Sequence, residues 1–207
     1  MVYSKDDISA IILAGGQGRR LGGKNKGLLN IKGETFVARL LSNLSTQTKT
    51  QIISANNDIV QYQQLNRTVI QDENDNYQGP LSGIISCQEE IRTDLILTLP
   101  CDSPLVPLNL TKKLLSSYNQ NAQTRLCVVH DGERRQNLFM LFHRDLLQNM
   151  QQYFQSGERK VQNWIDQQDF IEVDFSDQAI SFTNINKESD MSKLLMLIEQ
   201  ENSRRQP

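Results

Sequence analysis

The sequence predicts a three-layer α/β/α sandwich, in which helices cover both faces of a mostly parallel sheet. Two observations support this fold class. Short apolar runs with the length of buried strands alternate four times with segments of helical periodicity, up to about residue 125. The chain has 207 residues, which fits one domain at roughly 100–200 residues per domain. We therefore expect residues 1–207 to form a single domain with right-handed crossovers between parallel strands.

The first part of the chain contains four predicted strand–helix units. The apolar run Ile8–Leu13 stops at a glycine cluster, as expected for a buried strand that enters a tight loop. The apolar residues within 36–44 recur at helical spacing and predict a helix packed on the sheet. A turn is expected at residues 79–83. The predicted strands are Ile8–Leu13, 51–55, Thr68–Ile70 and 94–99, and the predicted helices are 36–44, 58–65, 81–91 and 108–118.

The pattern changes after residue 125. Leu126–His130 and residues 138–142 flank a short polar turn, which predicts a hairpin or a looped strand pair. Further elements are expected in the order helix 144–154, strand 170–175 and closing amphipathic helix 191–200. Residues 202–207 are expected to fray at the end of the chain.

Composition excludes several classes of protein. Lys+Arg is 22 and Asp+Glu is 24, and the resulting net charge of −2 lacks the basic excess typical of nucleic-acid-binding domains. No apolar run approaches the ~20 residues that span a membrane, and the charged N-terminus is followed by too short an apolar stretch for a signal peptide. Three cysteines and two histidines follow no metal-ligand spacing. We therefore expect a reduced, cytoplasmic protein that binds neither nucleic acid nor membrane.

The loop after the first predicted strand is the most informative segment. It is dense in glycine, whose backbone N–H groups can turn toward an anion without a Cβ in the way. Open α/β sheets also place their ligands at the carboxyl ends of strands. The loop carries four cations, which are Arg19, Arg20, Lys24 and Lys26. The segment therefore predicts a polyphosphate-binding loop.

Two common phosphate-binding motifs fit this loop only in part. The dinucleotide fingerprint begins at Gly16, but Leu21 occupies the position of its third glycine. A Walker A loop begins at Gly18, but Asn25 replaces the Ser or Thr that would hold magnesium. A dehydrogenase with a dinucleotide-binding fold therefore fits less well than a protein that binds a nucleoside triphosphate.

The loop resembles the signature of the sugar-nucleotide-type nucleotidyltransferases, through Leu13-Ala14-Gly15-Gly16-x-Gly18-x-Arg20-Leu21-Gly22-Gly23-x-x-Lys26. Further motifs follow in order, namely Asp72, Gly79-Pro80-Leu81-Ser82-Gly83, Pro100-Cys101-Asp102-x-Pro104, His130-Asp131-Gly132-Glu133, Gly157-Glu158-Arg159-Lys160-Val161 and Asn184-Ile185-Asn186. The whole series is similar to the molybdenum cofactor guanylyltransferases. The resemblance implies a Rossmann-like sheet of the nucleotide-diphospho-sugar transferase type. It also implies transfer of GMP from GTP to the terminal phosphate of molybdenum-molybdopterin, with release of pyrophosphate.

The resemblance assigns catalytic roles to Lys26, Arg20 and Asp102. The two cations would neutralise the triphosphate, and Asp102 would hold Mg²⁺, with Mn²⁺ as the alternative metal. Asp72 is assigned to the guanine base, whose N1–H and N2–H₂ a carboxylate can accept together. Each carboxylate also has a structural alternative, since Asp102 can cap the next helix and Asp72 can be a solvated turn residue. Catalysis is expected to rest on positioning and electrostatics, without a covalent intermediate.

The resemblance divides the substrates between the two parts of the chain. The part up to about residue 125 would bind GTP through Leu13, Ala14, Gly15, Gly16, Gly18, Lys26, Ser54, Asn56, Asp72, Gly79, Pro80, Gly83 and Asp102. The later part would bind molybdopterin through His130, Asp131, Arg159, Asn184 and Asn186. GTP and molybdenum-molybdopterin are thus the expected substrates of a monomer. Transient contacts with cofactor-synthesis proteins or apo-molybdoenzymes are compatible with that activity.

Two departures from the family pattern keep alternatives open. Asn25 stands where the family often has an acidic residue before the loop lysine, and Ser54 stands where a nucleoside-contacting Asn is expected. One alternative is a related cytidylyltransferase that uses CTP with the same pterin, which Asp72 would discriminate. Another is a non-catalytic GTP-binding adaptor that retained the loop and lost turnover.

Overall fold

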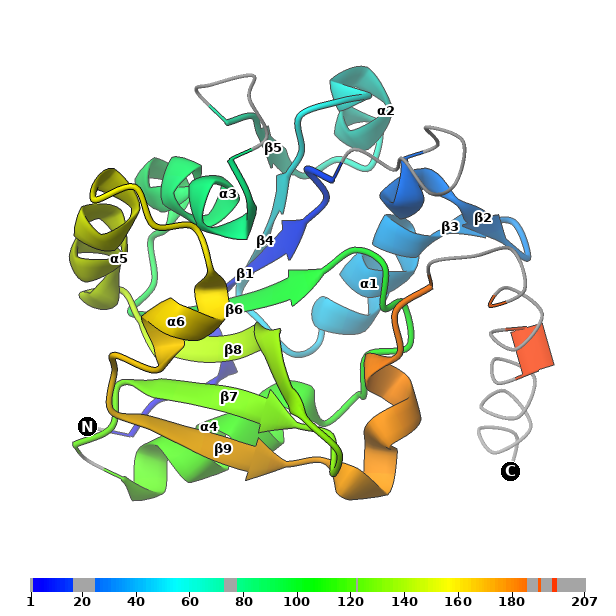
Figure 1. Cartoon of the computed structure of the whole chain (residues 1–207). Coiled ribbons are helices and arrows are strands. Elements are labelled where there is room, and N and C mark those ends of the chain that lie inside the picture. The colour runs from blue at the N-terminus through cyan, green and yellow to red at the C-terminus, as the bar shows by residue number, and fades with distance from the viewer. Residues whose placement is uncertain are drawn as a thin grey trace.

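The computed structural model of the chain describes residues 2–16, 25–72, 78–121, 123–185, 190 and 195–196. At its centre is a seven-stranded sheet in the order β5-β4-β1-β6-β8-β7-β9 (Figure 1). All neighbouring strands in it are parallel except β8, which runs antiparallel to both β6 and β7. The predicted three-layer α/β/α architecture with a mostly parallel sheet is therefore confirmed.

The strands of the described chain are β1 (Ile8–Leu13), β2 (Asn30–Ile31), β3 (Glu34–Thr35), β4 (Thr50–Ser54), β5 (Thr68–Ile70), β6 (Leu95–Pro100), β7 (Leu126–His130), β8 (Arg135–His143) and β9 (Phe170–Asp174). The α-helices are α1 (Phe36–Leu44), α2 (Ile59–Gln63), α3 (Pro80–Ser86), α4 (Leu110–Gln120), α5 (Leu146–Gln155) and α6 (Val161–Ile165). Short 3₁₀ turns are η1 (Lys5–Asp7), η3 (Lys26–Leu28), η4 (Gln88–Glu90) and η5 (Ser176–Phe182). No described helix is long and apolar enough to cross a membrane.

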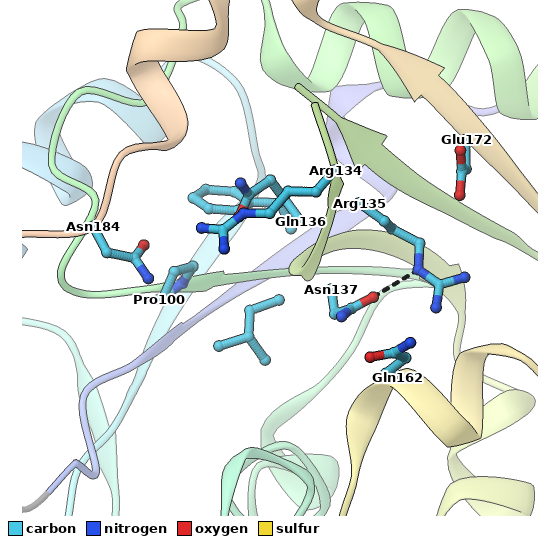
Figure 2. A pocket seen from close by; sticks show the side chains of 10 residues that line it. Pro100, Arg134, Arg135, Gln136, Asn137, Gln162, Glu172 and Asn184 are labelled. Carbon is cyan, nitrogen blue, oxygen red and sulfur yellow. Dashed lines mark hydrogen bonds between the residues drawn. The ribbon is translucent and has the colours of Figure 1, made fainter. Parts of the chain in front are cut away.

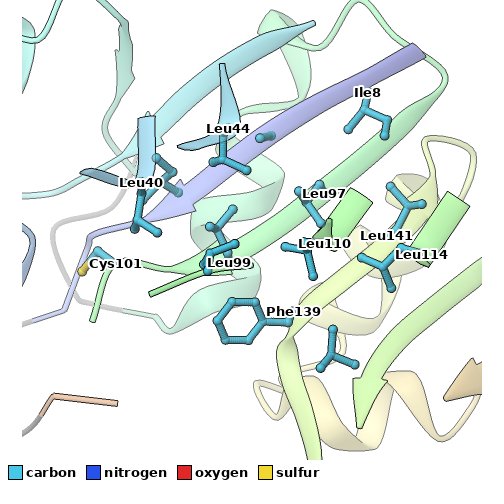
Figure 3. Close-up of a cluster of buried hydrophobic side chains, with 14 of the residues drawn as sticks. Ile8, Leu40, Leu44, Leu97, Leu99, Cys101, Leu110, Leu114, Phe139 and Leu141 are labelled. Carbon is cyan, nitrogen blue, oxygen red and sulfur yellow. The ribbon is translucent and has the colours of Figure 1, made fainter. Parts of the chain in front are cut away.

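Alternating side chains on the strands build two cores, one on each face of the sheet. On β1, Ile8, Ala10 and Ile12 pack with helices α1 and α4 (Figure 3), and Tyr62 of α2 joins this cluster. Ile11 faces the other way, into the cluster formed with α3, α5 and α6. Because both faces are covered, strands β1 and β6 are apolar almost throughout, which is why they read as continuous runs.

The register of the central strands brings the ends of three chain segments together. Leu13 at the end of β1 pairs with Ser54 on β4 and with Pro100 on β6. The loops that follow these strands therefore leave the sheet side by side. This edge of the sheet positions the candidate site.

Several boundaries differ from expectation. The turn expected at 79–83 is shorter, because helix α3 already begins at Pro80. The helix expected at 81–91 ends at Ser86, and the separate 3₁₀ turn η4 follows it. The second strand of the hairpin begins at Arg135, three residues before the expected start. The hairpin β2–β3 and helix α6 were not predicted. Of the helix expected at 191–200, only residues 195 and 196 are described, and residues 202–207 lie outside the description.

Candidate active site

The glycine loop and the segment with Asp102 start from neighbouring strands. The N–H of Ala14 donates to the carbonyl of Ser54 at 2.7 Å, and the N–H of Cys101 donates to the carbonyl of Leu13 at 3.1 Å. These two backbone bonds continue the sheet by one residue beyond its strands. They fix the start of both loops relative to each other.

Lys26 and Asp102 form an ion pair at this edge. Lys26 Nζ lies 2.9 Å from Asp102 Oδ2, and the two side chains are 20% and 16% exposed. The other carboxylate oxygen, Asp102 Oδ1, is buried and has no hydrogen-bond partner among the residues that the structure describes. A buried oxygen that lacks a partner is costly, so this atom is poised to accept a ligand. The structure thus brings together two of the three predicted catalytic residues, while Arg20 lies outside the described residues.

The arrangement around Asp102 fits a magnesium ion that binds together with substrate. Within the described residues, no group of three or more His, Cys, Asp or Glu side chains could hold a metal alone. Mg²⁺ is commonly bound by one or two carboxylates with the remaining positions taken by phosphate oxygens and water. Asp102 Oδ1 provides such a single hard ligand.

Asp72 is a second buried carboxylate with an unpaired oxygen. The amide of Asn56 holds it twice, since Nδ2 donates to Asp72 Oδ2 at 3.1 Å and Oδ1 accepts the Asp72 N–H at 2.9 Å. Asp72 is 7% exposed, and its Oδ1 lacks a hydrogen-bond partner within the described ranges of the chain. Asn56 thus orients the carboxylate, whose free Oδ1 and singly bonded Oδ2 can together accept two adjacent donors such as those of guanine.

The predicted glycine positions are close to these polar groups. A Cβ on Gly15 would lie 3.2 Å from Asn56 Nδ2, whereas a Cβ on Gly16 would meet nothing within 4 Å. A Cβ on Gly83 would lie 2.4 Å from Ser54 Oγ, so helix α3 can approach β4 only with glycine at this position. Ser54 therefore packs beneath α3. Gly18 lies outside the described residues.

Gly79 and Pro80 form the start of helix α3. Gly79 has φ +93°, a left-handed conformation that favours glycine, and Pro80 occupies the first turn of the helix, where its missing N–H costs nothing. These residues turn the chain into helix α3, whose apolar residues pack against the sheet.

The thiol of Cys101 stands directly beside Asp102 but is unsuited to nucleophilic chemistry. Burial, and then the neighbouring charge of Asp102, raise the pKa of Cys101 to about 12. The thiol is therefore protonated at neutral pH, and a thiol rather than a thiolate is a poor nucleophile.

His130 is the last residue of β7, and Asp131 begins the turn between β7 and β8. The N–H of Gly132 donates to His130 Nδ1 at 3.1 Å. Asp131 Oδ1 accepts the N–H groups of Glu133 and Arg134, and Oδ2 accepts Gln136 Nε2 at 2.5 Å. Burial would raise the pKa of Asp131, but these hydrogen bonds outweigh it and hold the pKa below the usual value. Both oxygens of Asp131 are thus used within its own turn.

The predicted acceptor residues are not all brought together. Asn184 lines a cavity of about 540 Å³, which Arg159, His130 and Asp131 do not line. Arg159 lies instead beside the nucleotide half, where its guanidinium donates to Gln78 Oε1 at 3.1 Å and lies 3.8 Å over the ring of Phe154. Asn186 lies outside the described residues.

This cavity contains residues that the sequence did not single out. It is lined by Pro100, Arg134, Arg135, Gln136, Asn137, Leu138, Phe139, Gln162, Glu172 and Asn184. Arg134 extends toward Pro100 and Asn184 on one side of the cavity, while Asn137 and Gln162 lie together on the other (Figure 2). Arg135 is engaged in an ion pair with Asp166 at 2.7 Å and a hydrogen bond to Asn137. In the sequence, the adjacent residues Arg134 and Arg135 directly after the predicted turn could have indicated this cavity.

Comparison with known proteins agrees with this geometry. Residues 10–172 match the family model described as MobA-like NTP transferase domain. A molybdenum cofactor guanylyltransferase from Shewanella frigidimarina is 37% identical over 187 residues, covering 90% of this chain and 95% of the relative. One from Histophilus somni is 41% identical over 186 residues, with the same coverage of 90% and 95%.

A solved structure shares the fold. It is the molybdopterin-guanine dinucleotide biosynthesis protein A from Archaeoglobus fulgidus, with a TM-score of 0.76 and 17% identity, covering 93% of this chain and 99% of that one. The family match spans the glycine loop, both carboxylates Asp72 and Asp102, and the hairpin with the two arginines. This chain therefore belongs to the MobA-like NTP transferase family, as one of its molybdenum cofactor guanylyltransferase-like members.

Proposed function

We propose that this protein transfers GMP from GTP to the terminal phosphate of molybdenum-molybdopterin, forming the guanine dinucleotide cofactor and pyrophosphate. The observation that carries the proposal is the pair of carboxylates, Asp72 and Asp102, at one edge of the sheet. Each has one buried oxygen without a hydrogen-bond partner within the described part of the chain. One suits a base that presents two adjacent donors, and the other suits a metal bound with phosphates.

In this proposal the nucleotide lies across the carboxyl ends of β1, β4 and β6. The backbone after β1, at Gly15 and Gly16, faces the triphosphate, while Asp72 accepts the N1–H and N2–H₂ of guanine. Asn56 keeps Asp72 in place through its two hydrogen bonds. Adenine lacks this donor pair, and the edge of cytosine presents a different pattern, so the carboxylate favours GTP.

The reaction joins two phosphates and requires no general base. An oxygen of the acceptor phosphate attacks the α-phosphorus of GTP, and the bond from that phosphorus to the β-bridging oxygen breaks, with its electron pair leaving on pyrophosphate. Lys26 supplies positive charge where negative charge develops on the leaving group. Asp102 would hold Mg²⁺, or Mn²⁺ in its place, through Oδ1. When bound, the metal would neutralise the phosphates and orient them for in-line attack.

The acceptor would bind in the cavity between Pro100 and the hairpin formed by β7 and β8. This cavity adjoins the Asp102 segment, because the carbonyl of Asp102 accepts the N–H of Ile185, the residue after Asn184. Arg134 extends into it and is suited to the acceptor phosphate, whereas the amides of Asn137 and Gln162 suit a polar heterocycle. The chain up to about residue 125 would thus hold GTP, and the later part the pterin.

A turnover assay tests the proposal. Pyrophosphate release is measured with GTP, CTP, ATP or UTP, each with Mg²⁺, in the presence and absence of molybdenum-molybdopterin. We expect pyrophosphate release with GTP and not with the other three nucleotides. This release should require molybdenum-molybdopterin. Faster release with CTP would assign the chain to cytidylyl transfer, and GTP binding without release under any condition would indicate a non-catalytic adaptor.

A further inference from the structure

The turn that carries Lys26 is held by a side chain that the proposed mechanism does not use. Asn25 precedes this turn, and its Oδ1 accepts two hydrogen bonds, from the N–H of Gly27 at 3.2 Å and from Tyr62 Oη at 2.7 Å. Its Nδ2 donates to Asp58 Oδ2 at 3.3 Å. One amide thus ties the Lys26 turn to helix α2 and to the residue before that helix.

The turn also rests directly on the tyrosine hydroxyl. A Cβ on Gly27 would lie 2.3 Å from Tyr62 Oη and 2.8 Å from Val37 Cγ2, so only glycine lets the backbone come this close. Tyr62 is completely buried. Burial, followed by the neighbouring Cys101 and Asp58, raises the pKa of Tyr62 and keeps its hydroxyl a neutral donor.

The two ends of the turn are therefore fixed independently. On one side, Asn25 and Gly27 are anchored to Tyr62; on the other, Lys26 Nζ reaches Asp102 Oδ2 at 2.9 Å. A lysine has several rotatable bonds, and the position of its ammonium depends on where the backbone starts. An anchored backbone therefore lowers the conformational entropy cost of placing the Lys26 ammonium on a phosphate.

The chemistry at position 25 also explains the departure from an acidic residue. A carboxylate there could still accept from Gly27 and Tyr62, but it would have no hydrogen to offer Asp58 and would repel it. Asp58 has φ +54°, a conformation that Asn tolerates as well as Asp. The neutral amide at 25 and the carboxylate at 58 thus form a matched donor–acceptor pair that can in principle be exchanged.

We propose that Asn25, Tyr62 and Asp58 are positioning residues for Lys26, and that Asn25 must be neutral because it faces Asp58. The role of Lys26 rests on the proposed function, whereas the anchor itself can be measured in the free protein. The role assigned to the three residues acts through the Lys26 turn, so they are positioning residues and not catalytic residues.

The test uses the full chain with four variants: Tyr62→Phe, Asn25→Asp, Asp58→Asn and the double variant Asn25→Asp/Asp58→Asn. Both measurements are made at a temperature below thermal unfolding of every variant. The first is the hydrogen-exchange rate of the Gly27 amide without ligand. The second is the calorimetric Kd of the Mg²⁺-bound triphosphate that the wild type binds most tightly. Tyr118→Phe, which alters a tyrosine of α4 distant from the turn, is the matched control.

We expect Tyr62→Phe and Asn25→Asp to accelerate Gly27 exchange and to weaken binding up to about fivefold, because one such hydrogen bond or like-charge contact is worth about 1 kcal/mol. The double variant should return both quantities to within about twofold of the wild type, since it restores the exchanged donor–acceptor pair. Tyr118→Phe should change neither.

Other outcomes separate the two proposals. Unchanged Gly27 exchange in all variants would overturn the anchor. Faster Gly27 exchange with unchanged triphosphate binding would reduce the anchor to a structural role and overturn positioning. A double variant as impaired as Asn25→Asp would contradict the charge argument. A wild type that binds no triphosphate would contradict the proposed function, while Gly27 exchange would still decide whether the anchor exists.

Discussion

Three carboxylates lie at the same edge of the sheet, and they differ in what their oxygens contact. Asp72 and Asp102 each have one buried oxygen without a hydrogen-bond partner among the described residues. Asp131, after β7, has both oxygens occupied by two backbone N–H groups and a glutamine amide of its own hairpin. The first two belong to the half expected to bind nucleotide, and the third to the half expected to bind the acceptor.

Under the proposed function, this difference separates two carboxylates with an oxygen available to a ligand from one that stabilises its own turn. An unpaired buried oxygen costs about 1–3 kcal/mol, which folding tolerates where binding later satisfies the group. A fully hydrogen-bonded carboxylate stabilises its own loop and has few accepting positions left for a ligand. Position after a strand is therefore insufficient to identify a binding carboxylate, and the hydrogen bonds around it decide.

The largest effect is expected for Asp102→Asn. The amide cannot provide the charge that Mg²⁺ requires, and loss of one transition-state electrostatic contact commonly costs about 10²- to 10³-fold in turnover. Pyrophosphate release should fall by at least this lower bound, while thermal unfolding stays near that of the wild type. A loss below about tenfold would indicate that Asp102 is no more than the ion-pair partner of Lys26.

Asp72→Asn should have the next largest effect. It replaces the acceptor of two guanine donors with a group that accepts at only one atom, so calorimetric GTP affinity should fall about 10- to 100-fold. Binding of ATP should be unchanged. Asp94→Asn, an exposed carboxylate at the opposite end of β6, serves as the control. Equal GTP affinity in both variants would show that Asp72 does not read the base.

Asp131→Ala should act on stability and not on nucleotide binding. Loss of its hydrogen bonds should lower the free energy of unfolding by about 1–3 kcal/mol at pH 7. The folded pKa of Asp131 lies below the usual 3.8, so its contribution is present above that pH and is lost as pH falls further. Urea titrations of variant and wild type should therefore converge in acid. A stable variant with weakened GTP binding would make Asp131 a ligand-binding residue like the other two.

Arg134→Ala should have the smallest of these effects. It should distinguish acceptor binding by the later part of the chain from GTP binding by the earlier part. We expect the KM for the pterin to rise about tenfold, as for loss of one charge-assisted contact, with GTP affinity unchanged. Arg144→Ala, an exposed arginine after β8 at the other edge, is the control. Weaker GTP binding in Arg134→Ala would place the nucleotide in the cavity assigned to the acceptor.

Much of the nucleotide half was readable from sequence, because its strands are buried on both sides. Continuous apolar runs gave β1 and β6 nearly to the residue. The hairpin β2–β3 was missed since each strand has two residues, although Lys32 and Gly33, both with positive φ, form the kind of turn that joins tight hairpins. Helix α6 is similarly too short for periodicity to reveal.

Other features depend on contacts that no local pattern encodes. The insertion of β8 between β6 and β7 reflects packing of distant strands. Arg159 was grouped with acceptor residues, but its side chain contacts Gln78 before α3. For Asp131, the sequence indicated a polar residue at a strand end, and only the folded hairpin reveals that its oxygens are already satisfied.

The most direct test of the central claim is a calorimetric comparison of GTP, inosine triphosphate and CTP, each with Mg²⁺, on the wild-type protein. Inosine triphosphate lacks the 2-amino group and so removes one of the two donors assigned to Asp72. The account predicts that GTP binds most tightly, inosine triphosphate about tenfold more weakly for one lost charge-assisted bond, and CTP more weakly still. Equal affinity for GTP and inosine triphosphate, or a preference for CTP, would contradict it.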